Sequence, residues 1–292
     1  MDLQLAIQQY QEALEATPPD HPNRAARLNN LGTGYLNRYQ KTGAEIDLQL
    51  AIQQFEDTLE ATPQDHPNRA ARLNNLGAGY LNRYQKIGAE MDLQLAIQQF
   101  EDTLEATPQD HSERAERLQD LGTGYHNRYL RTVAEIDLQL AIQHFKDTLE
   151  ATLQDHPQWA ERLEFLGTGY RRAEMDLQLA IQQYQEALEA TPPDHPERAA
   201  RLEYLGTGYR DRYQKTGAEM DLQLAIQQYQ EALEATPPDY LERAERLQDL
   251  GIGYLDRYQK TGAEIDLQQA IQQFEDTLEA TPPDHLERAE RL

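Results

Sequence analysis

The chain has 292 residues with 51 acidic and 27 basic side chains, so its formal net charge at pH 7 is −24. Binding to nucleic acid requires a basic surface that displaces counterions from phosphates, and adsorption to anionic lipid also requires basic residues, so this composition argues against both partners. The chain contains no cysteine, which excludes disulfides, thiolate metal ligands and a cysteine nucleophile.

No segment of the chain has the pattern of a membrane anchor or an export signal. No run of residues is long or apolar enough to span a bilayer. Met1 is followed by Asp-Leu-Gln-Leu, and not by the basic and then apolar stretch of a signal peptide. We therefore expect a protein without a membrane partner and with a cytoplasmic location.

One block of sequence recurs along the chain. MDLQLAIQQY begins at residue 1, and the same or closely similar blocks begin at residues 46, 91, 136, 175, 220 and 265. The spacing is 45 residues except between the fourth and fifth blocks, where it is 39. Residues 1–45 and 46–90 are identical at 37 of 45 positions. A fixed period of this length is typical of a solenoid or a propeller.

Each repeat contains the pattern of two helices. Apolar side chains recur at helical spacing between Asp47 and Thr62, with Asp47 predicted as the N-cap and Pro63 ending the helix. A second helical stripe follows the turn after Pro63 and ends before Gly88, which suits a left-handed C-cap. No stretch alternates like a strand. The sequence therefore predicts an all-α fold of stacked helical hairpins.

Six positions of the repeat resemble the tetratricopeptide repeat (TPR) family. In that family a Leu-Gly pair and a Tyr lie on the first helix, an Ala and an aromatic residue on the second, and a Pro closes the unit. The matching positions are Leu31, Gly32, Tyr35, Ala51, Phe55 and Pro63. The usual unit has about 34 residues, and this longer one is most similar to the arrays of kinesin light chain and of large signalling proteins. The resemblance implies a right-handed α-solenoid (superhelix) of antiparallel helix pairs.

The family pattern predicts one array that covers residues 1–292. It begins with a lone second helix at 2–17 and ends with a partial first helix at 285–292. The six predicted helix pairs are 22–62, 67–107, 112–152, 157–191, 196–236 and 241–281.

The residue types that carry catalysis are present without a catalytic arrangement. The glycine pair Gly32 and Gly34 recurs in every unit, but lacks the third glycine and preceding strand of a dinucleotide site, so we expect close helix packing instead. Six of the eight histidines occur once per unit in turns such as Asp65-His66, without the spacing of a zinc site. Catalytic carboxylates need contrasting environments, which copied residues lack. We expect no enzymatic activity, no cofactor and no metal.

The resemblance implies that a partner protein or peptide binds the concave face formed by the first helices. In one binding mode of the family, a Lys two residues before the Leu and an Asn two residues after it bind a C-terminal carboxylate. No unit here has that Lys or that Asn at the corresponding position. The face is polar and neutral in the first half and more acidic later, which favours a neutral or basic partner. The candidate polar contacts are Asn30, Asn75, Asp120, Glu164, Glu203 and Asp249.

The fourth pair differs most from the others. After Tyr170, eight residues of the repeat are replaced by Arg171-Arg172. The same unit holds Trp159, the chain's one tryptophan. Phe165 and, in the next unit, Tyr204 replace the Asn or Asp of other repeats. Two interpretations are open: these aromatic residues anchor a partner, or they fill volume left by the shortened helix.

Two functions compete, with a third possibility beside them. The first is a non-enzymatic protein-interaction scaffold that presents its groove to a peptide or protein. The second is self-assembly, in which uncapped ends stack head-to-tail into homo-oligomeric filaments. The candidate self-association residues are Leu3, Leu5, Ile7, Leu286, Ala289 and Leu292. The third possibility is that the chain is a fragment of a longer receptor, whose neighbouring segments cap the ends.

Overall fold

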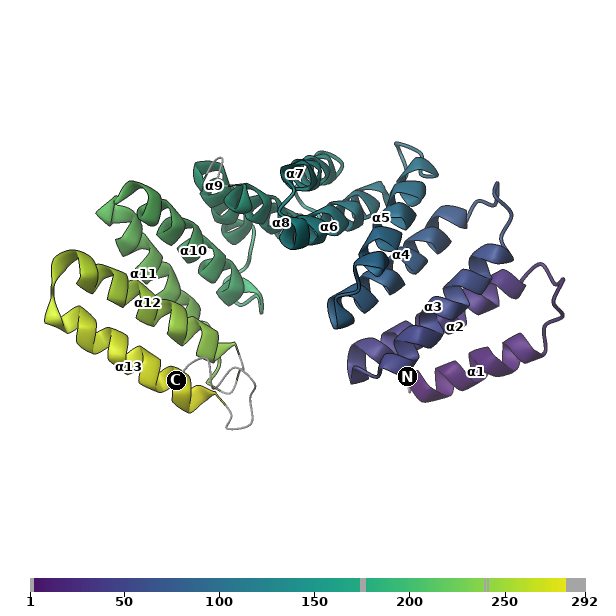
Figure 1. Ribbon diagram of the computed structural model, residues 1–292, viewed down its shortest axis with the longest axis horizontal. Coiled ribbons are helices and arrows are strands. Elements are labelled where there is room, and N and C mark those ends of the chain that lie inside the picture. Colours follow the sequence, from purple (N-terminus) through teal and green to yellow (C-terminus); the bar gives the residue numbers. More distant parts are fainter. Residues whose placement is uncertain (1–2, 174–176, 239, 241, 282–292) are drawn as a thin grey trace. The chain divides into compact units, whose positions relative to one another are not determined.

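The computed structural model describes residues 3–173, 177–238, 240 and 242–281 (Figure 1). Within these residues the chain forms thirteen α-helices and no β-strand. The chain divides into two compact units, Met1–Thr152 and Leu153–Leu292, which are called unit 1 and unit 2 and are described separately. In both units consecutive helices pack against each other, which confirms the predicted all-α solenoid of stacked helix pairs.

Unit 1 contains one single helix and three helix pairs. The bounds are α1 Leu3–Glu15, α2 Arg24–Thr42, α3 Glu45–Glu60, α4 Arg69–Ile87, α5 Glu90–Glu105, α6 Arg114–Thr132 and α7 Glu135–Glu150. Each helix packs against the next one along the chain, and the two helices of a pair share the larger contact. The first helices of successive pairs, α2, α4 and α6, also touch directly. They line what is called the first-helix face of unit 1.

Unit 2 contains three further pairs. The bounds are α8 Trp159–Arg172, α9 Leu177–Glu189, α10 Arg198–Thr216, α11 Glu219–Glu234, α12 Arg243–Thr261 and α13 Glu264–Ala280. The same order of packing holds here, and α8 touches α10 directly. The helices α8, α10 and α12 line the first-helix face of unit 2.

The helices lie inside the ranges that the repeat pattern predicts. Helix α1 corresponds to the lone second helix at 2–17 and α2–α3 to the pair at 22–62. The predicted partial helix at 285–292 lies outside the described residues. That residues 1–292 form one array stays a prediction.

In the five full-length pairs, the turn is fixed by a left-handed residue and by a partly buried ion pair. Gly88 ends α4 with φ 69°, as its position in the repeat predicts. The prediction that Asp47 caps α3 was wrong, because the N-cap is Ala44 and Asp47 lies buried in the first turn. Its carboxylate accepts two hydrogen bonds from Arg38, at 2.7 Å to Nε and 2.5 Å to Nη2.

This Arg–Asp contact, called the turn clamp, joins the end of the first helix to the start of the second. It recurs as Arg83–Asp92, Arg128–Asp137, Arg212–Asp221 and Arg257–Asp266. A bidentate pair between a half-buried guanidinium and a buried carboxylate is stronger than an exposed pair, because its donors and acceptors match in geometry. A carboxylate in the first turn also interacts favourably with the helix dipole.

The repeated glycines allow close packing of helices, as the sequence predicts. A Cβ atom on Gly32 would lie 2.6 Å from Cε1 of Phe55, the aromatic residue of the same pair. A Cβ atom on Gly34 would lie 3.1 Å from Cγ1 of Ile7, on the preceding helix. The first glycine therefore serves the contact within a pair, and the second serves the contact with the preceding helix.

In the fourth pair, the described residues at the end of α8 differ from this pattern. Helix α8 has 14 residues, whereas α4 and α10 have 19. Its C-cap, Ala173, is right-handed. The deletion after Tyr170 also removes the arginine of the turn clamp.

Candidate partner-binding face

Side chains on the first-helix face of unit 1 make contacts from one repeat to the next. Nδ2 of Asn75 donates to Oδ1 of Asn29 at 2.9 Å, and Nδ2 of Asn74 donates to Oδ2 of Asp120 at 2.9 Å. Both contacts join residues 46 apart. The stacking therefore places two predicted candidates, Asn75 and Asp120, in one row of amide and carboxyl groups. The third, Asn30, lies exposed on α2.

Asp120 is the member of this row whose charge is buried with the least compensation. Burial raises the pKa of its carboxyl from 3.8 to about 6, and Glu116 raises it further, while the hydrogen bond from Asn74 opposes the shift. Oδ1 of Asn74 is itself buried and accepts no hydrogen bond within the described residues. A carboxylate with one amide donor and no cation beside it is expensive to bury.

In unit 2 the same face carries ion pairs. Glu164 accepts a hydrogen bond from Nε of Arg201, and Glu203 accepts one from Nε of Arg246 at 3.0 Å. Both arginines are buried, and each also donates to the threonine that ends the preceding helix pair, Thr191 or Thr236. The two glutamates, predicted as partner contacts, therefore also neutralise buried guanidinium groups.

In unit 1 the arginine equivalent to Arg201 has no glutamate at the position of Glu164. Arg72 occupies the position of Arg201 and donates to Oγ1 of Thr62 at 2.6 Å. Asn29 occupies the position of Glu164 and carries no charge. Burial lowers the pKa of the Arg72 guanidinium. The glutamates of unit 2 are therefore part of the fold as well as candidate contacts.

Glu203 and Asp249 are two carboxyl groups that oppose each other across successive repeats. They have the register of the Asn74–Asp120 contact, 46 residues apart. Burial, and then the charge of Asp249, raise the pKa of Glu203 to about 7, although Arg246 opposes this. Burial raises the pKa of Asp249 to about 6, although Arg210 opposes it. A partner cation near this pair would relieve the repulsion.

A second row of ion pairs was missed by the sequence analysis. Nη1 of Arg171 lies 3.2 Å from Oδ2 of Asp211, and Nε of Arg210 lies 2.7 Å from Oδ2 of Asp256. The earlier repeats have Leu or His at the arginine position and Asn at the aspartate position. The paired change from Leu or His to Arg and from Asn to Asp was the signal that could have revealed these contacts.

The candidate aromatic residues lie at different depths. Tyr204 is 38% exposed, and its ring stacks on that of Tyr184 with centroids 5.9 Å apart. Burial, and then the carboxylates of Glu164 and Glu203, raise the pKa of the Tyr204 hydroxyl, so the structure brings these three residues together. Phe165 is half-buried on α8. Trp159 begins α8, about 9 Å along the helix axis from Phe165.

Comparison with known proteins identifies the repeats. Residues 24–68, which span α2, α3 and the following turn, match the family described as tetratricopeptide repeat. This segment is therefore identified as a tetratricopeptide repeat, and the other helix pairs repeat its sequence closely. The resemblance seen in the sequence is therefore confirmed. A comparison with curated protein sequences gives no match.

Three solved structures illustrate the similarity of fold. A putative kinesin light chain of Podosopora anserina with nearly identical TPR-like repeats has a TM-score of 0.52 and 20% identity, over 71% of this chain and 96% of that one. YrrB, a TPR protein with an unusual peptide-binding site, has a TM-score of 0.51 and 20% identity, over 79% and 98%. BtubC (BKLC) of P. vanneervenii has a TM-score of 0.59 and 16% identity, over 80% and 91%. Similarity at these identities concerns the fold.

Helix α1 has the sequence of the second helices of the other pairs. Leu5 is 50% exposed, Leu3 is half-buried and Ile7 is buried. Ile7 packs close to Gly34 of α2. The other self-association candidates, Leu286, Ala289 and Leu292, lie outside the described residues. The exposed apolar surface of α1 is therefore centred on Leu5.

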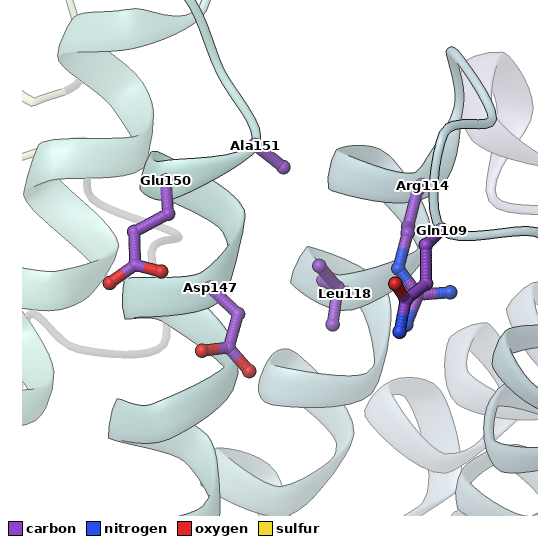
Figure 2. A pocket seen from close by; sticks show the side chains of 6 residues that line it. All are labelled: Gln109, Arg114, Leu118, Asp147, Glu150 and Ala151. Carbon is purple, nitrogen blue, oxygen red and sulfur yellow. The ribbon is translucent and has the colours of Figure 1, made fainter.

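A hollow of about 320 Å³ lies between α6 and α7 at one end of the third tetratricopeptide pair. Figure 2 shows Asp147 and Glu150 on one wall, Arg114 and Gln109 on the other, and Leu118 between them. The Arg114 guanidinium donates to the carbonyl of Thr107 at 2.8 Å. Small-molecule sites are usually enclosed and mostly apolar, and this open polar hollow is not of that kind.

The turn histidines have a structural contact. Nδ1 of His66 accepts a hydrogen bond from the backbone N–H of Asn68 at 3.1 Å. The contact recurs at His21, His111, His156 and His195. Among the described residues no group of acidic and histidine side chains has the arrangement of a metal site. None of the helices described combines the length and apolar character needed to cross a bilayer.

Proposed function

We propose that this chain is a non-enzymatic protein-interaction scaffold, which binds an extended segment of a partner along its first-helix faces. Tetratricopeptide repeats generally serve as interaction scaffolds, and one structural neighbour, YrrB, is described as having a peptide-binding site. The observation that carries the proposal is the fixed register of the first helices. In three places a side chain of one repeat meets one of the next repeat, 46 residues on, so groups recur at regular steps, as the groups of an extended peptide do.

The chemistry of the two faces supports a neutral or basic partner. Unit 1 offers amide groups, which can both donate to and accept from a peptide backbone. In unit 2 the ion pairs neutralise Glu164 and Glu203 in part, and Asp249 adds a further carboxyl group. Tyr204 presents part of an aromatic ring beside these groups, and such rings are enriched among residues that dominate binding energy.

A peptide-binding measurement tests the proposal. Synthetic peptide sets of neutral, basic and acidic composition are titrated against the folded chain and against a Phe165→Ala/Tyr204→Ala variant. We expect neutral or basic peptides to bind, and the variant to bind them about tenfold more weakly. A matched control replaces Met220 and Ile265, which are exposed on the second helices of unit 2, and should bind unchanged. Equal binding by a folded Phe165/Tyr204 variant would remove the anchor role, and no binding by any set would remove the peptide groove.

A second candidate function, end-to-end self-assembly, is favoured by the surface of α1. Leu5 is 50% exposed, and Leu3 is half-buried where the equivalent Leu48 is 2% exposed. A surface that meets a different surface of a second copy leads to open growth when rotation does not close the assembly. Light scattering against protein concentration tests this, with Leu5→Gln as the variant that should reduce growth. Constant mass at all concentrations would remove this candidate.

A further inference from the structure

The turns of the second and third pairs of unit 1 expose a group of large apolar side chains. This turn patch consists of Ile87, Met91, Leu130, Val133 and Ile136, which are between 48% and 71% exposed. Ile87 and Met91 flank the turn between α4 and α5, and the other three flank the turn between α6 and α7. Scattered exposed apolar residues are normal, but neighbouring ones indicate an interaction surface.

The two turns are neighbours in space. Nε of Arg131, in the last turn of α6, lies 3.3 Å from Oε1 of Glu90, the first residue of α5. This ion pair joins the α6–α7 turn to the α4–α5 turn. The apolar residues on either side of it therefore belong to one surface.

Three members of the patch depart from otherwise copied sequence. Ile87 stands where all the other full-length pairs have threonine, Leu130 where they have glutamine, and Val133 where they have glycine. Each change replaces a polar residue or a glycine with a larger apolar one at these two turns. Since all three are exposed, the helix packing of unit 1 does not require them.

The backbone of Val133 is strained. Its φ angle of 55° lies in the left-handed region, which disfavours β-branched residues. The side chain is the most exposed of the patch, so burial within the unit does not compensate for the strain. Strain of this kind persists where a residue serves binding.

The charges around the patch point to the partner. The chain carries a net charge of −24, so two copies repel each other over most of their surface. At the turns of unit 1, however, three exposed cations, Lys41, Lys86 and Arg131, accompany three exposed anions, Glu45, Glu90 and Glu135. This edge is locally neutral, and it offers both signs of charge to an identical edge.

We propose that the turn patch binds the turn patch of a second copy in a two-fold homodimer. A two-fold contact brings the same surface of both copies together, so the apolar residues face each other and each copy's basic residues can meet the other's Glu90 and Glu135. The inference goes beyond the scaffold function, because it uses the turn edge and leaves the first-helix faces open. It also differs from end-to-end growth, because a two-fold contact closes after two subunits.

Sedimentation of the full chain tests the proposal. We expect a reversible dimer, and we expect the variant Ile87→Thr/Leu130→Gln/Val133→Gly, which restores the repeat sequence, to weaken it at least about tenfold. The matched control Met220→Thr/Ile265→Thr removes two equally exposed apolar residues from unit 2 and should dimerise normally. Circular dichroism checks that each variant is folded.

Three outcomes would overturn the proposal. The wild-type chain sedimenting as a monomer at every concentration would show that the patch binds no second copy and is left to a different partner. Undiminished dimerisation of the folded triple variant would place the contact elsewhere. Loss of association with Leu5→Gln but not with the triple variant would show that α1 holds the copies together. None of these results bears on peptide binding by the first-helix faces.

Discussion

Val133 is the one non-glycine residue with a positive φ angle in the described chain. Left-handed backbone costs an L-residue about 1–2 kcal/mol, and glycine escapes this penalty but gains freedom in the unfolded chain. We therefore expect Val133→Gly to raise the free energy of unfolding by about 0.5–1 kcal/mol. The measurement is the urea midpoint, taken at a protein concentration where wild type and variant have the same oligomeric state.

Gly88→Val is the reverse change in the preceding repeat. Gly88 has φ 69°, and a Cβ atom there would meet nothing within 4 Å, so the substitution tests backbone strain without a steric clash. We expect it to lower stability by about 1 kcal/mol. If both substitutions left the urea midpoint unchanged, the turn would tolerate side chains and strain at Val133 would not exist.

Protonation of the Asp120 carboxyl should make unit 1 more stable in mild acid. The pKa of this carboxyl is raised to about 6 in the folded chain from 3.8, so between these values the folded state binds the proton more tightly than the unfolded state. Its contribution to stability therefore falls as pH rises through this window, and the full cost of the buried charge is present above about pH 6.

Asp120→Asn removes that cost and leaves an amide that can face Asn74, as Asn75 faces Asn29. We expect the variant to gain about 1–3 kcal/mol over wild type near pH 8, and to lose this gain as pH falls towards about 4. Thermal unfolding at several pH values measures it. Asp110→Asn, in an exposed turn, is the control and should change little at either pH. A gain that is the same at all pH values would contradict the burial argument.

At the scale of the helix pair, Gly77 shows how packing overrides helix propensity. Alanine forms helices better than glycine by about 1 kcal/mol, yet a Cβ atom on Gly77 would lie 2.6 Å from Cε1 of Phe100. Overpacking costs about 1–3 kcal/mol, so we expect Gly77→Ala to destabilise the chain by about 1–2 kcal/mol. Denaturant unfolding measures this, and Phe100→Leu should reduce the penalty in a double-mutant cycle. Additive effects of the two changes would show that the ring is not the obstacle.

The shortened pair should be the first part of unit 2 to open. Helix α8 ends at a right-handed C-cap, and the deletion after Tyr170 removes the arginine of the turn clamp; α8 also shares less contact with α9 than α10 shares with α11. Amides in elements with few buried contacts exchange through low-energy opening. We expect the amides of α8 to exchange with deuterium faster than those of α10, its full-length counterpart in the same unit. Slower exchange in α8 would contradict this.

The fold could be predicted from the sequence because a single amphipathic pattern is repeated. Leu31, Gly32 and Phe55 identify the packed faces, and Gly88 marks the left-handed turn, since each of these roles follows from the residue's own chemistry. The role of Asp47 could not be predicted in this way. An aspartate at the start of a helical stripe suits an N-cap, and only the folded turn brings Arg38 to it.

The partner-binding face was predicted less well, because its contacts depend on how repeats stack. The sequence gives the positions of Glu164 and Glu203 but not their distance from Arg201 and Arg246, which lie one repeat further on. The two glutamates were therefore predicted as partner contacts. Substitutions that occur together, such as those to Arg210 and Asp256, indicate which residues of successive repeats are in contact. They can be interpreted once the 46-residue spacing of these contacts is known.

At the scale of the whole molecule, the excess of negative charge opposes the ion pairs. The chain has 51 acidic and 27 basic side chains, so at least 24 carboxylates have no cation to pair with, and their mutual repulsion destabilises the folded state. Salt weakens both the ion pairs and the repulsion, but the turn clamps and the pairs to buried arginines are partly shielded from solvent and are screened less.

We therefore expect salt to stabilise the chain. The screening length falls from about 30 Å at 0.01 M to about 10 Å at 0.1 M salt, which removes most repulsion between distant carboxylates. Tm should rise by about 2–5 °C over this range, equivalent to about 1 kcal/mol. Magnesium chloride at equal ionic strength distinguishes screening from a specific site: an equal rise supports screening, and a much larger one would reveal a cation site. A fall in Tm with sodium chloride would mean that the ion pairs outweigh the repulsion.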